Sequence, residues 1–90
     1  MEVQFKKKFL KDLDKVPSNI REKIKDLVFK VFPESSDFSE IPNIKYIGGY
    51  SDYYRIRQGD YRIGFHYSKK DSIVTFYRVL HRKDIYKKFP

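Results

Sequence analysis

The stretch YYRIRQGDYRIGFHY, residues 53–67, has the pattern of a β-hairpin with a two-residue turn at Gly59-Asp60. That turn places Arg57 opposite Arg62 on the neighbouring strand. Because side chains alternate across a strand, each strand presents basic residues on one face and apolar residues on the other. The basic face carries Arg55, Arg57, Arg62 and His66, and the apolar face carries Ile56, Ile63 and Phe65. The hairpin therefore predicts a sheet with one buried face and one basic face.

The residues on either side of the hairpin predict an α+β fold. Apolar residues recur at helical spacing over residues 9–16 and 20–31, Pro33 closes the second helix, and Asn19 with Glu22 predicts a capping box at its start. Twofold alternation predicts strands at residues 2–5, 44–48, 52–58, 61–68 and 72–80. We expect residues 1–90 to form one domain: an N-terminal strand, a two-helix hairpin on one face of a small antiparallel sheet, and a short C-terminal helical turn. The other face of the sheet is expected to be open.

A second turn at Lys69-Lys70 extends the register into the last strand. It places Val79 on the basic face and Leu80 toward the helices, so that His81 emerges on the basic side. A three-residue turn would reverse these assignments. Arg78 does not fit the pattern, because the same register points its charge toward the helices.

The composition limits the kinds of partner and site. The chain has 20 Lys and Arg against 12 Asp and Glu, a formal net charge of +8, which attracts nucleic acid, an acidic protein or an anionic membrane surface. Eight Tyr and eight Phe beside so many cations suit single-stranded RNA. The absence of cysteine excludes disulfides and thiolate metal sites, and His66 and His81 lack companions for another metal site. With no long apolar run and a charged start after Met1, we expect a soluble cytoplasmic protein.

The basic face has two interpretations. A like-charge pair such as Arg57 and Arg62 is destabilising unless a phosphate or an acidic segment offsets it. The alternative is a solvated outer face whose charges are screened by salt. In the following HRKDIY segment, residues 81–86, His81 is a candidate for proton exchange and Tyr86 for stacking on a base. The alternatives there are a histidine satisfied by the backbone and a tyrosine that anchors the tail.

The order of the elements, together with the segments YRIR at 54–57, GDYRIGF at 59–65 and RVLHRKDIY at 78–86, resembles the RelE/ParE superfamily of toxins from type II toxin–antitoxin modules. The resemblance is nearer to the RelE-like branch. It implies an endoribonuclease, an mRNA interferase that cuts mRNA in the ribosomal A site without a metal or cofactor. In that reaction the 2′-hydroxyl attacks the adjacent phosphate, leaving a 2′,3′-cyclic phosphate and a 5′-hydroxyl. The resemblance also implies an acidic antitoxin, which we expect to cover the basic face.

The resemblance assigns roles to particular residues. Arg55 and Arg57 stand where RelE has lysines, and arginine cannot give up a proton, so we expect these two residues and His66 to bind RNA phosphates. A related branch uses a histidine–tyrosine pair near the C-terminus. The catalytic candidates are therefore His81 for proton exchange, Tyr86 for orienting the nucleotide, and Arg62 with Arg82 for stabilising developing charge.

Two rival functions remain open at the level of the sequence. A ParE-like toxin poisons DNA gyrase and has no nuclease activity. A non-catalytic basic module binds RNA, or only its acidic partner, without cutting. The arginine face and the HRKDIY segment favour RNA cleavage, because a gyrase poison has no need for an imidazole and a phenol there.

Overall fold

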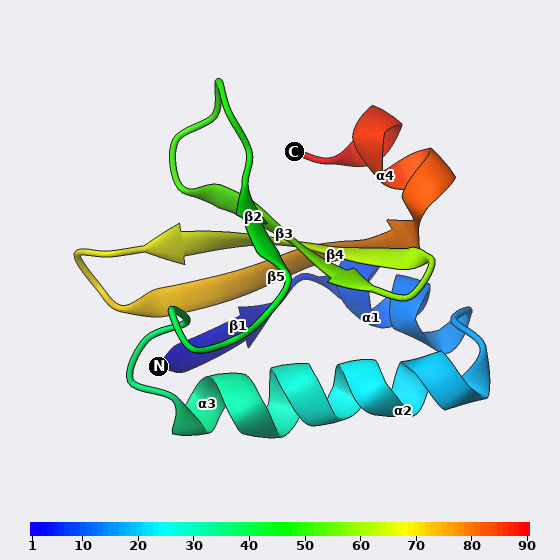
Figure 1. Ribbon diagram of the computed structural model, residues 1–90, viewed down its shortest axis with the longest axis horizontal. Helices are drawn as coiled ribbons and strands as arrows, with labels where there is room; N and C mark the ends of the chain where they lie inside the picture. Colours follow the sequence, from blue (N-terminus) through cyan, green and yellow to red (C-terminus); the bar gives the residue numbers. More distant parts are fainter.

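The centre of the fold is a five-stranded sheet of order β1-β5-β4-β3-β2 (Figure 1). The computed structural model describes residues 1–90. Neighbouring strands are antiparallel, except that β1 runs parallel to β5. The expected antiparallel meander is thus present within a mixed sheet, whose strands are β1 (Glu2–Phe5), β2 (Ile44–Tyr46), β3 (Tyr53–Gln58), β4 (Tyr61–Ser68) and β5 (Ile73–His81).

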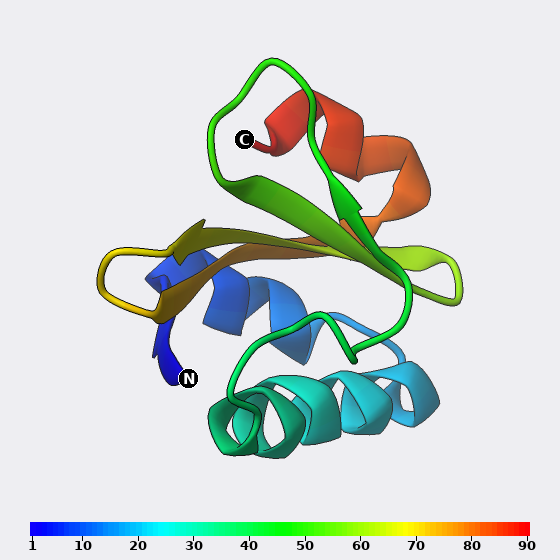
Figure 2. The ribbon, with the colours of Figure 1, turned by 60° about the vertical axis from the view of Figure 1, so that its left-hand side comes forward.

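The predicted two-helix hairpin packs on one face of this sheet (Figure 2). It consists of α1 (Lys7–Asp14) and of α2 (Ser18–Asp26), which continues through a π-helical stretch, η1 (Leu27–Val31), into α3 (Phe32–Glu34). The core forms between the apolar stripes of these helices and the apolar face of the sheet. Burial of each such side chain stabilises the fold by about 1.5–3 kcal/mol. The fully buried side chains from both layers include Phe9, Ile24, Val28, Phe32, Ile56, Ile63, Phe65, Val74, Phe76 and Val79.

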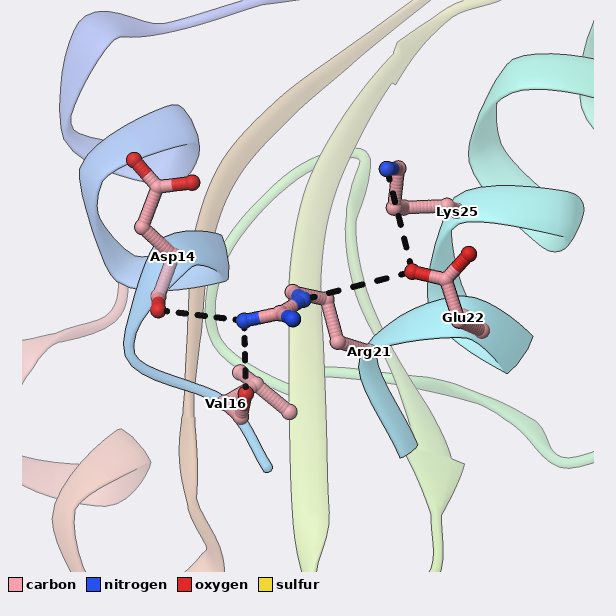
Figure 3. A network of polar contacts seen from close by, with 5 residues as sticks. All are labelled: Asp14, Val16, Arg21, Glu22 and Lys25. Atoms are coloured by element: carbon pink, nitrogen blue, oxygen red, sulfur yellow. Dashed lines mark hydrogen bonds and ion pairs between the residues drawn. The ribbon is translucent and has the colours of Figure 1, made fainter. Parts of the chain in front are cut away.

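Arg21 fastens the connection between α1 and α2 (Figure 3). Its Nη1 donates to the backbone oxygens of Asp14 and Val16, both at 3.4 Å, and so satisfies carbonyl groups at the end of α1. The expected capping box does not form, since α2 has no side-chain cap hydrogen bond. The Glu22 carboxylate instead lies 3.7 Å from Lys25 Nζ and 4.0 Å from Arg21 Nε.

The C-terminal segment forms a longer helix than the single turn expected. Helix α4 (Arg82–Lys88) lies on the face of the sheet opposite the helical hairpin (Figure 1). Ile85 is fully buried and Phe89 is 5% exposed. The prediction that this face is open was therefore wrong at this end, because the tail carries two apolar residues one helical turn apart. None of the helices is long and apolar enough to cross a membrane.

The register of the β3–β4 hairpin is the predicted one, with Arg57 opposite Arg62 and Arg55 opposite Gly64. The register of β4 with β5 departs from the prediction at one point. Gly64 pairs with Arg78 and Phe65 pairs with Phe76, so Tyr77 is an extra residue in β5. This arrangement is a β-bulge.

The bulge reverses the faces of the last three side chains of β5, those of Val79, Leu80 and His81. Val79 lies opposite Ile63 and is buried, whereas Leu80 lies opposite Arg62. His81 lies opposite Tyr61, which belongs to the helix-covered face. The predictions that Val79 and His81 face the basic side and that Leu80 faces inward were therefore wrong, because one inserted residue shifts the alternation.

The charge that did not fit the pattern has a partner in α1. Arg78 does point toward the helices, where its Nε donates to Asp12 Oδ2 at 2.7 Å and its Nη2 to Asp12 Oδ1 at 3.1 Å. The hydrogen bonds that Arg78 donates to Asp12 raise the pKa of Arg78, against the opposing effect of burial. Arg78 is thus a structural residue that joins β5 to α1.

Candidate functional site

A basic pocket opens on the face of the sheet that carries α4. We call it the arginine pocket; its volume is about 430 Å³. Strands β3 and β4 supply its three arginines, and α4 supplies the phenol. No carboxylate lines it. The lining residues are Asn43, Ile44, Lys45, Arg55, Arg57, Arg62 and Tyr86.

Neutral partners hold the three arginines of the pocket. Arg57 Nη2 lies 3.4 Å from Asn43 Oδ1, and Arg62 Nη1 donates to the backbone oxygens of Gly59 at 2.9 Å and of Tyr61 at 3.0 Å. The Cζ of Arg55 lies 4.5 Å from the centre of the Tyr86 ring, which is a cation–π contact. Because none of these arginines forms a salt bridge, their positive charge is free to bind an anion.

The facing arginines determine what the pocket can do. Guanidinium groups present fixed donors that match the oxygens of a phosphate, and they keep their charge at any working pH. Arg57 and Arg62 can therefore bind a phosphate and stabilise added negative charge on it, but neither can act as a proton acceptor. Among the other lining side chains, the Tyr86 phenol and the Lys45 ammonium are the two that can give up a proton.

The structure brings together Arg55, Arg57, Arg62 and Tyr86, as the sequence predicted, and leaves the other predicted residues outside. The ring of His66 is on the same face but packs 4.9 Å from the ring of Tyr53. Arg82 begins α4 and its Nε lies 3.8 Å from Asp60 Oδ1. Neither residue lines the arginine pocket.

His81 also lies outside the pocket, on the helix-covered face. Its Nδ1 accepts a hydrogen bond from the backbone N–H of Lys83 at 3.2 Å, so its side chain caps α4. Its ring lies 5.6 Å from the ring of Tyr61. This is the backbone-satisfied arrangement that the sequence left open as an alternative.

Sequence reasoning missed the two other polar lining residues, Asn43 and Lys45. Lys45 lies opposite Arg55 in the β2–β3 register, which brings its side chain to the arginine face. The alternation around Lys45 was a usable signal, but the long connection before β3 hid the register. Asn43 sits in the preceding loop with φ of 67°, a conformation that asparagine tolerates better than most residues. Nothing else in the sequence pointed to it.

Residues 3–86, which span the helical hairpin, the sheet and most of α4, match the family described as ParE toxin of type II toxin-antitoxin system, parDE. The chain therefore belongs to this family of toxins. Within this family the chain is a RelE-like toxin. It is 48% identical to Toxin RelE3 of Methanocaldococcus jannaschii over 91 residues, which cover 100% of both chains.

Solved structures agree with this assignment. A chain in the crystal structure of the RelB-RelE antitoxin-toxin complex from Methanococcus jannaschii is 45% identical, with a TM-score of 0.82, over 97% of this chain and 99% of that one. A chain in the intact E. coli RelBE toxin-antitoxin complex is 26% identical, with a TM-score of 0.64, over 87% of this chain and 92% of that one. The resemblance read from the sequence is thus confirmed.

Proposed function

We propose that this toxin is a ribosome-dependent mRNA interferase that cleaves RNA in the arginine pocket. The observation that carries the proposal is the convergence of three unpaired arginines and Tyr86 in one pocket without a carboxylate. The positive charge of such a pocket can bind the phosphates of RNA, and the exposed phenol ring can stack on an adjacent base. The identity to Toxin RelE3 supports the same branch of the family.

In the proposed reaction, the 2′-oxygen of one nucleotide forms a bond to the adjacent phosphorus while the bond from phosphorus to the 5′-oxygen breaks. The 2′-hydroxyl loses its proton to a base, and the leaving 5′-oxygen gains one. Arg57 and Arg62 bind the non-bridging phosphate oxygens, whose charge grows in the transition state. Because guanidinium groups supply this positive charge, we propose that cleavage needs no metal. The products are a 2′,3′-cyclic phosphate and a 5′-hydroxyl.

Tyr86 and Arg55 have a paired role in this proposal. Tyr86 is 61% exposed, so a nucleotide base can stack on its ring while Arg55 contacts the other side of the ring. The Tyr86 phenol or the Lys45 ammonium donates the proton that the leaving 5′-oxygen gains, and water takes up the proton that the 2′-hydroxyl loses. Proton exchange by His81, charge stabilisation by Arg82 and phosphate binding by His66 stay predictions. We expect cleavage to depend less on these three residues, since their side chains do not line the pocket.

We further propose that an acidic antitoxin inhibits the toxin by covering the arginine pocket. The net charge of +8 favours such a partner, and the relative from Methanococcus jannaschii was crystallised as a complex of RelB and RelE. A polypeptide bearing Asp or Glu side chains would satisfy the same guanidinium groups that bind RNA phosphate.

Primer extension on a reporter mRNA in a reconstituted translation system, with and without ribosomes, tests the proposal. Discrete cuts within A-site codons are expected with ribosomes only, and they should be lost in Arg62→Ala. The control is Lys23→Ala, which removes an exposed cation from α2 on the other face of the sheet and should leave the cuts intact. Intact mRNA together with inhibited DNA supercoiling by gyrase would contradict the proposal and favour the ParE-like alternative.

A further inference from the structure

The ring of Phe89 lies directly against the backbone of Gly64. Any other residue in place of Gly64 would have a Cβ in the space that the ring fills. A Cβ built on Gly64 would lie 2.5 Å from two atoms of this ring and 2.7 Å from a third, closer than real Cβ contacts allow. The ring is also flanked by Tyr53 and Tyr77, with ring centres at 5.7 Å and 5.9 Å. Gly64 thus leaves room for the ring of Phe89 in the middle of the sheet.

The contact between Gly64 and Phe89 lies beside the arginine pocket. Gly64 is the cross-strand partner of Arg55, and Arg55 in turn contacts the ring of Tyr86. Two neighbouring positions of the sheet therefore contact α4 and the residue that follows it: Gly64 contacts Phe89, and Arg55 contacts the exposed Tyr86. A displacement of one contact moves the other, because Phe89 directly follows α4 and its N–H is hydrogen-bonded to the oxygen of Ile85 in the last turn.

The two ends of α4 are held by different interactions. At its start, the backbone N–H of Arg82 donates to Asp60 O at 2.7 Å, and His81 caps the first turn. At its end, Phe89 N–H donates to Ile85 O at 2.9 Å, and both side chains are buried. Without the ring of Phe89, the end of α4 would keep only Ile85 as a buried contact.

We propose that Gly64 and Phe89 are positioning residues that keep Tyr86 over the arginine pocket, an inference that rests on the proposed function of that pocket. Neither residue lines the pocket or touches its space. Their effect passes through α4 to the ring of Tyr86. A misplacement of about 1 Å at a reacting centre costs about 100-fold in rate, so small movements of α4 matter.

The position of Tyr86 can be measured without any RNA. The Arg55 guanidinium protons beside the ring experience a ring-current shift, which is visible in ¹H–¹⁵N spectra and assignable by its loss in Arg55→Lys. We expect Gly64→Ala and Phe89→Ala to move this signal to its position in Tyr86→Leu. Gly48→Ala is the matched control, because nothing lies within 4 Å of a Cβ at Gly48. Phe89→Ala introduces no clash, so it remains informative if Gly64→Ala folds poorly.

The activity measurement uses the same variants in the translation assay. Gly64→Ala and Phe89→Ala should each lower kcat by about 100-fold with a smaller change in KM, and Phe89→Tyr, which keeps the ring, should retain activity. Gly64 and Phe89 act through the same contact, so adding Gly64→Ala to Phe89→Ala should cause no further loss of kcat. These results would support the positioning role.

Other results would overturn it. An Arg55 signal that is unchanged in Phe89→Ala means that the anchor does not place Tyr86, whether or not the protein cleaves RNA. A shifted Arg55 signal with unchanged kcat means that the placement of Tyr86 does not matter for cleavage. If the wild-type protein cuts no RNA, the spectra still decide whether the contact positions Tyr86, so the two failures can be told apart.

Discussion

Asp12 in α1 accepts hydrogen bonds from both Arg78 and the backbone N–H of Val79 in β5, the latter at 3.2 Å. One carboxylate thus satisfies both the Arg78 charge and a backbone N–H of the bulged strand just before that strand leads into α4. The side chains of Asp12 and Arg78 are only 10% and 18% exposed, so water cannot easily replace either partner. This pair therefore secures the position from which α4 begins.

Asp12→Ala should lower the free energy of unfolding by about 3 kcal/mol, because it leaves the Arg78 charge without its partner inside the protein. Urea denaturation measures the change. Glu22→Ala is the control, since it removes an exposed carboxylate from weak ion pairs and should change stability by less than about 1 kcal/mol. Equal effects of the two substitutions would contradict a structural role for the buried pair.

Arg57→Thr should stabilise the free protein while weakening its binding of RNA. It removes a like charge that faces Arg62 and places a β-branched residue in a strand, for a gain of about 0.2–1 kcal/mol. Thermal unfolding and fluorescence anisotropy with a non-cleavable RNA measure the two effects. A loss of both stability and binding would show that Arg57 has a structural role beyond the pocket.

His81→Asn and His81→Ala should differ in their effects. Asparagine is a good N-cap and can replace the acceptor for Lys83 N–H, whereas alanine removes it and should cost about 0.5–2 kcal/mol of stability. Cleavage assays and urea denaturation on both variants measure the difference. If Asn fails in cleavage as completely as Ala while remaining stable, then His81 exchanges a proton in the reaction and its cap is secondary.

Stability should fall as the pH rises above 10. Burial raises the pKa of Tyr53 above its ordinary value of 10.0, and the neighbouring Tyr77 raises it further. The unfolded chain therefore loses this proton at a lower pH than the folded chain, and the stabilisation present below pH 10 declines above it. Urea midpoints at increasing pH should fall less steeply in Tyr53→Phe than in the wild type, whereas the exposed Tyr50→Phe should follow the wild type.

The sequence predicted the fold and the arginines of the pocket because the Gly59-Asp60 turn sets the register of its hairpin. It could not predict the face of His81, because that depends on one extra residue, Tyr77, in β5. No Gly, Asn or Pro marks this bulge in β5. The inward charge of Arg78 was the one available sign of it, and it became interpretable only once Asp12 was seen opposite.

The helical turn of the tail was predicted, but its packing against the sheet was hard to judge from the sequence. Ile85 and Phe89 have the spacing of one helical turn, but two apolar residues in a basic segment do not by themselves predict burial. Their partners are a glycine and two tyrosines from the middle of the sheet. That contact can be seen only in the tertiary structure. The sequence therefore did not predict that the tail covers one end of the basic face of the sheet.

The parallel pairing of β1 with β5 has a consequence for the order of folding. Glu2 pairs with Ile73 across the sheet, so β1 cannot join the sheet until β5 has been synthesised. Such a high contact order delays closure of the hydrophobic core. The arginine pocket also needs Tyr86, which follows β5 in the chain. Both the core and the arginine pocket are therefore completed only after the last fifth of the chain has left the exit tunnel.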